Sequence, residues 1–421
     1  MPPAPPWPIG ARVLFRFALA YVVLYILPFP LDLALGERAS KPWDVLVQRA
    51  GHHVPGLPAP IPFEETGSGD RTWDYVRILC AATLAGAAAA VWSLLALRRP
   101  SGHPRLLEWL RVLVRFYLGT MMIAYGSFKL VPSQFPAMPL DKLLQRYGES
   151  SPMGLLWNFM GHSPAYQSFT GAAEALAGAL LLFRRTTLPG ALLSVAVLAH
   201  VVLLNFCFDV PVKQFSCHLL AMALFLLLPD LRRLADVLLL HRAVPAAQPQ
   251  PLFPGRRWRV AARVLASAVL VLSFGGFLTI SYVAYTDHGR GAPRSPLRGV
   301  WSVEEFSMDE AARPPLLTDA DRWSHVTFDG PRFVVIRDMR DRRHFYSVRH
   351  DEAARTLTLA GRSETGPELA LSYERPDSAT LLITGDVNGH PLRARLRRRD
   401  ESDFLLTSRG FRWVNESPDN R

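Results

Sequence analysis

Long apolar runs, separated by polar and proline-rich stretches, fill the first two-thirds of the chain. Because a helix needs about 20 mostly apolar residues to cross a bilayer, these runs predict membrane-spanning helices. We place seven of them at approximately residues 12–33, 75–97, 107–131, 167–183, 188–208, 215–228 (extending to 240) and 260–285. The first run is long and lacks a small-residue cleavage site, so we predict a retained helix rather than a removed signal peptide.

The last third of the chain changes to an alternation of period two, which is typical of half-buried strands. Turn-forming residues separate the runs, as at Asp329-Gly-Pro and Arg375-Pro-Asp-Ser. The ten predicted strands are 300–306, 325–328, 332–336, 345–348, 356–359, 368–373, 380–384, 392–396, 404–407 and 411–414. Eight to ten short strands without intervening helices predict a closed antiparallel barrel or a sandwich.

The two patterns together predict an α-helical multi-pass membrane bundle followed by an all-β domain. We divide the chain into an N-terminal membrane region with two helices and a long outer loop (1–106), a four-helix core (107–242), a linker with an anchor helix (243–289) and a soluble β domain (290–421). Residues 296–415 are expected to fold alone. The lipid bilayer is therefore the first predicted partner.

The basic residues predict how the bundle is oriented, because cytoplasmic loops of membrane proteins carry an excess of Lys and Arg. Arginines concentrate on one set of alternate connections: Arg12, Arg16, Arg98, Arg99, Arg105, Arg111, Arg184, Arg185, Arg232, Arg233, Arg242, Arg256, Arg257 and Arg259. The opposite connections are longer yet poorer in Lys and Arg. We therefore predict an inner-membrane protein with a cytoplasmic N-terminus and an extracytoplasmic β domain.

Charge and cysteine content exclude two classes of function. The formal net charge of +11 lies in the membrane part, because about 22 arginines and about 22 acidic residues cancel from Asp287 onward. Without a basic soluble face, nucleic acid is an unsuitable partner. Three cysteines in 421 residues exclude a disulfide scaffold.

Two ionisable residues lie deep in the predicted bundle, where charge is costly and normally faces the interior. Glu174 is ten residues from Arg184 and His200 is twelve from Leu188, so both lie roughly 15–18 Å from the cytoplasmic edge. Small residues from Gly171 to Ala179 favour close helix packing, which predicts that the two side chains meet. Such a pair either acts in proton or ligand chemistry or only fixes helix register.

Five further polar residues lie toward the outer ends of these helices: Tyr125, Lys129, Asn205, Asp209 and Lys213. We predict that they form a ligand-binding rim above Glu174 and His200. The alternative is that Lys129 extends to the headgroups and the others cap helix ends.

The remaining reactive side chains are cysteines and histidines. Cys207 and Cys217 flank one outer loop and form either a redox pair or two ordinary thiols. Cys80 is expected to be inert packing. His52 and His53 are adjacent and would point apart on a regular element, so we predict no metal site.

At residues 107–230 the chain resembles the DoxX family of bacterial membrane proteins. The resemblance is carried by Gly126 with Lys129, by the segment from Gly171 to Gly178 that contains Glu174, and by Arg-Arg-Thr-Thr-Leu-Pro-Gly from Arg184. Since the named member is the small subunit of a thiosulfate:quinone oxidoreductase, the resemblance implies a redox role, quinone as the ligand and a membrane partner subunit. Two extra N-terminal helices, long outer loops, a seventh helix and the β domain depart from the family pattern and weaken the transfer of thiosulfate oxidation.

The β domain resembles the lipocalins at a few residues. Trp301 follows Gly299 and Val300 at the start of the first predicted strand, and Arg412 lies on the last one. In lipocalins such a tryptophan closes one end of the barrel and a late arginine packs over it. An unrelated β sandwich is the alternative.

Three functions remain open at the level of the sequence, and none of them names a reaction. The first is a redox component that binds quinone or another small apolar ligand near Glu174. The second is a transporter or channel for a small solute, although no inverted repeat is visible. The third is a non-catalytic anchor that presents a ligand-binding β domain. Whether the protein is an enzyme stays open.

Overall fold

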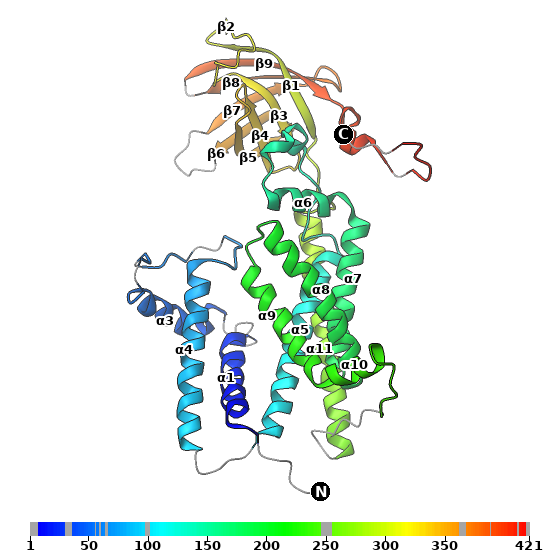
Figure 1. Cartoon of the computed structure of the whole chain (residues 1–421). Helices are drawn as coiled ribbons and strands as arrows, with labels where there is room; N and C mark the ends of the chain where they lie inside the picture. Colours follow the sequence, from blue (N-terminus) through cyan, green and yellow to red (C-terminus); the bar gives the residue numbers. More distant parts are fainter. Residues whose placement is uncertain are drawn as a thin grey trace. The chain divides into compact units, whose positions relative to one another are not determined.

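The computed structural model describes residues 7–29, 36–54, 56–58, 60–63, 66–96, 102–245, 255–361, 368–387, 389–410 and 412–417. The chain forms two compact units (Figure 1). The helical unit comprises Met1–Gln134 and Ser163–Tyr282, and the barrel unit comprises Phe135–His162 and Val283–Arg421. The segment 135–162, expected to be a loop of the membrane core, thus packs with the barrel; we call it the insert.

Seven long helices form where the apolar runs predicted them. They are α1 (Ile9–Ile26), α4 (Thr72–Leu95), α5 (Pro104–Leu130), α7 (Pro164–Leu182), α8 (Thr187–Cys207), α9 (Lys213–Leu227) and α11 (Arg256–Asp287). Within the described residues, five helical stretches are long and apolar enough to cross a membrane: α1, α4, α8, α9 with its extension, and α11. The protein is therefore a membrane protein. Helices α5 and α7 fall outside this set because they carry more polar residues.

Shorter helices occupy connections that the apolar pattern did not resolve. Helix α3 (Lys41–Gly51) packs Trp43 and Val47 against the start of α4. A short 3-10 turn, η5 (Leu228–Asp230), follows α9 and leads into α10 (Leu231–Leu238), so the expected extension of that helix is interrupted at Pro229. The last part of the first predicted helix, residues 30–33, lies outside the described residues.

Helices α5 and α7 approach one another backbone to backbone through four glycines, which we call the glycine interface: Gly119, Gly126, Gly171 and Gly178. A Cβ atom added at Gly171 would lie 2.5 Å from the backbone nitrogen of Leu130, and one at Gly178 would lie 2.5 Å from the carbonyl oxygen of Gly119. Only glycine permits such distances. The small residues therefore do bring two helices together, but the partner of α7 at this contact is α5.

The barrel is an up-and-down meander of eight strands closed by pairing of its first and last members. The strands are β1 (Gly299–Met308), β3 (Trp323–Phe328), β4 (Phe333–Asp338), β5 (Arg343–Asp351), β6 (Thr356–Gly361), β7 (Leu369–Glu374), β8 (Thr380–Val387) and β9 (His390–Arg399). A two-residue strand, β2 (Ala311–Ala312), adds to the edge of β1. The expectation of a closed antiparallel barrel is confirmed.

The last two predicted strands are wrong. Residues Leu405–Ser408 form a short helix, α12, and residues 412–417 form no strand, while Phe411 lies outside the described residues. Both segments are short and mostly exposed, so their alternation of apolar and polar residues reflects no sheet face. Pairing of β9 with β1 already closes the barrel and leaves no edge for them.

Trp301 lies at the centre of the closed barrel end, fully buried, and its indole N–H donates to the carbonyl oxygen of Leu297 at 2.9 Å. The arginine above its ring is Arg375, whose guanidinium carbon lies 6.0 Å from the ring centroid. Arg412 is exposed in the C-terminal tail. The expected role of Arg412 is wrong, because the chain after β9 leaves the barrel.

The insert contains two 3-10 turns, η2 (Leu140–Leu144) and η3 (Tyr147–Glu149), followed by α6 (Pro152–His162). Asp141 is buried on the barrel wall, where its carboxylate lies 3.2 Å from Arg343 and its carbonyl oxygen accepts a hydrogen bond from Arg337 at 3.1 Å. The backbone N–H of Leu140 donates to Asp329 at 3.2 Å. The barrel unit is thus built from two distant chain segments.

Candidate functional site

A buried ion pair joins α5 to α7. The ammonium group of Lys129 donates to Oε1 of Glu174, and the two residues are 8% and 4% exposed. Lys129 is thus buried in the contact between the two helices and does not have the outward direction that the alternative requires. Because each charge alone would be costly in an apolar interior, the pair is held together by strong mutual attraction.

The glycine interface positions this pair. Glu174 lies between Gly171 and Gly178 on α7, and a Cβ atom at Gly171 would come within 2.7 Å of Cβ of Lys129. The hydroxyl of Ser168 donates to the carbonyl oxygen of Leu130 at 2.9 Å and fixes the same end of the contact. Close backbone approach leaves the long lysine side chain with only a short distance to span.

The ion pair keeps unused hydrogen-bonding capacity. Oε2 of Glu174 is buried and has no hydrogen-bond partner among the described residues. An ammonium group has three N–H donors, and Lys129 uses one of them in its contacts with the described residues. A buried carboxylate oxygen without a partner costs roughly 1–3 kcal/mol or more, so such an atom commonly marks a ligand or water site.

His200 is exposed on α8 and does not meet Glu174. The buried face of α8 carries Ala191, Ser194, Leu198 and Asn205. His200 lies two residues after Leu198, which is about 200° around a helix, so it points away from that face. The predicted pairing of Glu174 with His200 is therefore wrong: depth alone does not fix the direction of a side chain.

The residues predicted to form the rim do not form one group in the structure. Asn205 is buried and donates to the hydroxyl of Ser216 at 3.0 Å, which joins α8 to α9. Asp209 is exposed and pairs with Lys213 at 2.7 Å. Among the described residues, these contacts close the turn between the two helices and none of them involves the Lys129–Glu174 pair, so for these three residues the helix-end alternative holds.

Tyr125 lies one turn before Lys129 on α5, as expected for a residue on the same face. Its ring packs on Phe215 of α9 with centroids 5.8 Å apart, and the residue is 40% exposed. It therefore lies beside the ion pair with part of its surface accessible.

A second cluster near this region was not identified from the sequence. His218 of α9 lies with Nε2 2.7 Å from the hydroxyl of Tyr21 and Nδ1 2.6 Å from the carbonyl oxygen of Gln214. Since a carbonyl can only accept, Nδ1 carries the proton. The imidazole stacks on Tyr25 with centroids 4.0 Å apart, and Arg77 lies over the same tyrosine ring at 5.7 Å. The residues occur on three separate helices, so no local spacing reveals them.

Asp70 fixes the N-terminal part of the helical unit to α9. Its two carboxylate oxygens accept hydrogen bonds from the backbone N–H groups of Lys213 and Gln214 at 2.7 and 3.0 Å. Gly69 adds a backbone hydrogen bond to Pro211 at 2.8 Å. A carboxylate at a helix N-terminus satisfies free donors and opposes the positive end of the helix dipole. The turn at residues 67–70 thus has a second role as a helix cap.

The cysteines form no disulfide. Cys207 is exposed, Cys217 is half-buried and Cys80 is buried, and all three are free. Over the described ranges, no group of three or more His, Cys, Asp or Glu side chains is arranged to hold a metal ion.

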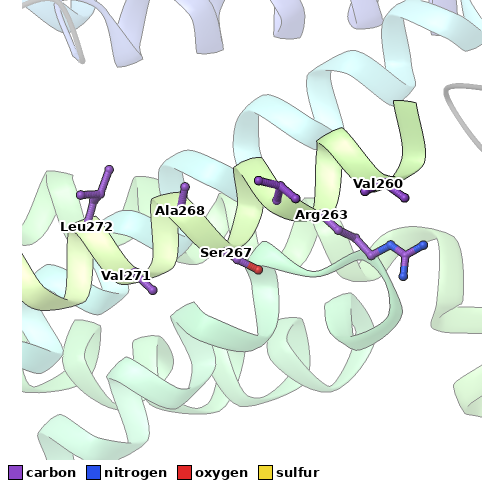
Figure 2. Close-up of a pocket in the computed structure, with 7 residues that line it drawn as sticks. Val260, Arg263, Ser267, Ala268, Val271 and Leu272 are labelled. Carbon is purple, nitrogen blue, oxygen red and sulfur yellow. The ribbon is translucent and has the colours of Figure 1, made fainter. Parts of the chain in front are cut away.

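An apolar groove runs along α11 (Figure 2). It is lined by Val260, Arg263, Val264, Ser267, Ala268, Val271 and Leu272. All of these residues belong to one helix, and the polar groups among them are Ser267 and Arg263. Such an exposed apolar helix face is what lipid chains cover in a membrane, so it is not a candidate for chemistry.

Comparison with known proteins gives one informative similarity. The chain is 33% identical to the uncharacterized protein YwoB of Bacillus subtilis (strain 168) over 123 residues, which are 29% of this chain and 78% of YwoB. No family model matches the chain, and no solved structure matches it. The similarity spans most of YwoB but leaves more than two-thirds of this chain outside it. On this similarity, the chain belongs to the family of YwoB.

Proposed function

We propose that the protein is a quinone-linked redox component of the membrane and that its ligand binds at the Lys129–Glu174 pair. The observation that supports this proposal is the buried Oε2 of Glu174, which has no partner among the described residues. The likeness of residues 107–230 to the DoxX family supports the same choice of ligand. Tyr125 adds an aromatic ring and a hydroxyl beside the pair.

The donor set suits a ligand that carries two oxygens on an apolar ring. A bound quinone supplies reversible two-electron, two-proton chemistry. Lys129 keeps donors that can hold a carbonyl oxygen, and the carboxylate of Glu174 can accept a proton from a hydroxyl group. The surrounding apolar helices exclude water and strengthen both interactions. Removal of the proton acceptor should therefore weaken binding of the hydroxylated form.

A binding experiment in lipid nanodiscs tests the proposal. Decylubiquinone and its reduced form are titrated into the full chain, with empty nanodiscs subtracted. We expect Glu174→Gln to weaken binding about tenfold or more, the effect of losing one hydrogen bond to a charged group. Glu108→Gln is the matched control, since Glu108 lies at the opposite end of α5 and is half-exposed.

Two outcomes count against the proposal. If the unaltered chain binds neither form, quinone is not the ligand. If Glu174→Gln binds as the unaltered chain does, the ligand does not use the ion pair. Tyr125→Phe, which removes only a hydroxyl and keeps the ring, provides a variant whose folding should be unaffected.

We also propose that all seven long helices cross the inner membrane, with the N-terminus in the cytoplasm and the barrel outside. The placement of arginines supports this orientation. The polar residues of α5 and α7 include the mutual pair Lys129 and Glu174, so the lower hydropathy of the two helices is compatible with crossing. A reporter fused after Arg421 should be active only in the periplasm; cytoplasmic activity would contradict the count of seven.

For the barrel, we propose a lipocalin-like architecture. The closed meander of eight strands and the buried Trp301 at the start of β1 support the likeness. The arginine over the tryptophan comes from the β7–β8 turn instead of the C-terminus.

A further inference from the structure

One end of the barrel departs from its apolar interior. At this end, β1, β4, β6 and β8 finish and β3, β5, β7 and β9 begin. Strand alternation directs Ile336 and Asp338 of β4, and His344 and Tyr346 of β5, toward the barrel axis. Deeper in the barrel the inward positions are apolar and fully buried, as at Phe328, Leu357 and Leu381. Polar side chains also point inward at the opposite end, where Nε2 of His350 lies 2.7 Å from the hydroxyl of Tyr373, but those two satisfy one another.

Two histidines enter the mouth, each with an aspartate beside it. Nε2 of His344 lies 3.3 Å from Oδ2 of Asp338, and Nδ1 of His390 lies 2.9 and 3.1 Å from the two carboxylate oxygens of Asp309. In the closed order of strands, β5 and β9 are four strands apart among eight, so they occupy opposite walls. The two histidines thus approach the same space from opposite sides.

That space is a cavity of about 390 Å³, lined by both histidines and by Met308, Arg313, Ala320, Asp321, Trp323, Ile336, Asp338, Tyr346 and Val387. Its size suits a small molecule. Met308, Trp323, Ile336 and Val387 supply an apolar floor. Both histidine side chains are about half-exposed, at 47% and 56%, so the cavity opens to solvent at its rim.

Three polar atoms facing the cavity residues remain available within the described part of the barrel. These are the hydroxyl of Tyr346, Nδ1 of His344 and Nε2 of His390; the aspartate contacts use the other ring nitrogen of each histidine. Burial raises the pKa of the Tyr346 hydroxyl, so this group stays protonated and can donate. Because a carboxylate only accepts, each imidazole gives its N–H to its aspartate and its free nitrogen accepts. A neutral hydroxyl group can therefore donate to these nitrogens and accept from the Tyr346 hydroxyl.

The charged groups of the lining are already matched. Arg313 contacts Asp319 and Asp321 at 3.3 and 3.4 Å, and the carboxylate of Asp338 accepts backbone hydrogen bonds from Arg340 and Arg342 at 2.8 and 2.9 Å. Among the described lining residues, each charged group therefore already has a partner, which favours a neutral ligand. Over the described residues the side chains also form no metal site.

We propose that the barrel mouth binds a small, neutral, ring-containing molecule that carries an oxygen function at each of two opposite ends. His344 and His390 each bond one of these oxygens, Tyr346 adds a donor, and the apolar floor covers the ring. The aspartates orient the imidazoles from behind. This site lies in the barrel unit and does not rest on the function proposed for the helical unit.

A purely structural role explains part of the arrangement but not all of it. Oδ1 of Asp338 caps the turn between β4 and β5, which accounts for the geometry of that hairpin without any ligand. It does not account for Oδ2, which points to His344. Nor does it account for a second pair, His390 with Asp309, at the opposite wall.

Three matched probes test the ligand class on the full chain in nanodiscs by calorimetric titration. They share one phenol ring and differ at the opposite end: 4-hydroxybenzyl alcohol is neutral, 4-hydroxybenzoate is anionic and 4-hydroxybenzylamine is cationic. We expect the neutral probe to bind at least tenfold more tightly than either charged one. His344→Phe and His390→Phe should each weaken its binding about tenfold, since one hydrogen bond of about 1.4 kcal/mol is lost in each case. His288→Phe, at an exposed position after α11, should have no effect.

The proposal is overturned if the neutral probe does not bind, if a charged probe binds as well as or better than it, or if both cavity variants bind normally. Should a histidine variant lose its barrel fold, Tyr346→Phe removes only a hydroxyl and gives the same test. Weaker binding of the neutral probe to Tyr346→Phe supports the site, and unchanged binding to it contradicts the assigned donor.

Discussion

Arg322 in the barrel unit and the Lys129–Glu174 pair in the helical unit are buried charges that are satisfied differently. In the barrel, Arg322 is 2% exposed and donates to the carbonyl oxygens of Arg313, Trp323 and Val303. In the helical unit, Lys129 and Glu174 have one another and, over the described residues, no further partner. A fully bonded buried charge fixes structure, whereas a half-bonded one leaves an atom for a ligand. The difference separates a structural network from a candidate site.

The largest expected effect comes from breaking the ion pair. Lys129→Met leaves the Glu174 carboxylate alone in the bundle and should lower the free energy of unfolding by about 3–5 kcal/mol. The double variant Lys129→Met with Glu174→Gln should lose less than the sum of the single changes. A double-mutant cycle on thermal unfolding in detergent measures this coupling.

The same cycle for Glu174→Gln with His200→Gln should give additive effects, because His200 faces away from the pair. Coupling between Glu174 and His200 of the size expected for Lys129 would contradict the arrangement of α7 and α8 described here.

Packing at the glycine interface should show the next largest effect. Gly171→Ala places a Cβ atom against backbone and should cost about 3 kcal/mol, since neither helix can yield. Gly86→Ala on α4 is the control: no atom lies within 4 Å of the added Cβ, so the higher helix propensity of alanine should raise stability slightly. The unfolding temperatures of the two variants should therefore shift in opposite directions. Equal shifts would exclude a close α5–α7 contact.

A pH-dependent effect is expected in the barrel. Burial, with Arg399 and Arg337 nearby, lowers the pKa of His325 to about 4. The folded barrel thus disfavours a proton that the unfolded chain accepts near pH 6.5, so stability is full above that pH and falls as the pH decreases toward 4. After allowance for solvent screening, we expect the free energy of unfolding of the barrel to fall by roughly 1–2 kcal/mol over this pH range.

His325→Gln should remove this part of the pH dependence. The measurement is denaturant unfolding of the chain in nanodiscs, followed through the β signal, at several pH values from 7 to 4. If the free energy of unfolding of this variant depends on pH as strongly as that of the unaltered protein, other groups cause the effect.

The smallest effect concerns the insert. Asp141→Asn weakens the contact with Arg343, which is one-third exposed, and should destabilise the barrel by about 1 kcal/mol. Lys142→Met, at the next residue, is the control. If the barrel is equally stable in both variants, the insert contributes through its backbone contacts alone.

The positions of the seven long helices could be predicted from the sequence because length and apolar composition alone decide them. Eight strands were predictable for a similar reason, because the alternation of apolar and polar residues along a strand shows which face of the sheet is buried. The strands expected after residue 403 are wrong, because an exposed tail can alternate by chance. Helix α3 was missed because its apolar positions, such as Trp43 and Val47, are few and lie among turn-forming residues.

The site was harder to predict than the fold. Glu174 and Lys129 were both identified as polar residues in an apolar setting, but their pairing depends on which helix α7 meets. The position of a residue within an apolar run indicates its depth in the membrane but not the direction of its side chain. For this reason His200 was wrongly predicted to be the partner of Glu174. The cluster of Tyr21, Tyr25 and His218 depends on contacts between α1 and α9, which local spacing does not encode.

The insert also has a consequence for the order in which the protein is made. A ribosome completes residues 135–162 more than a hundred residues before it reaches β1. During that interval Leu140 and Asp141 have no barrel to contact, while α7, α8, α9 and α11 are still being synthesised. The barrel unit can therefore be completed only when its last-made strands meet a segment that emerged much earlier, so its assembly waits for synthesis of the helices between them.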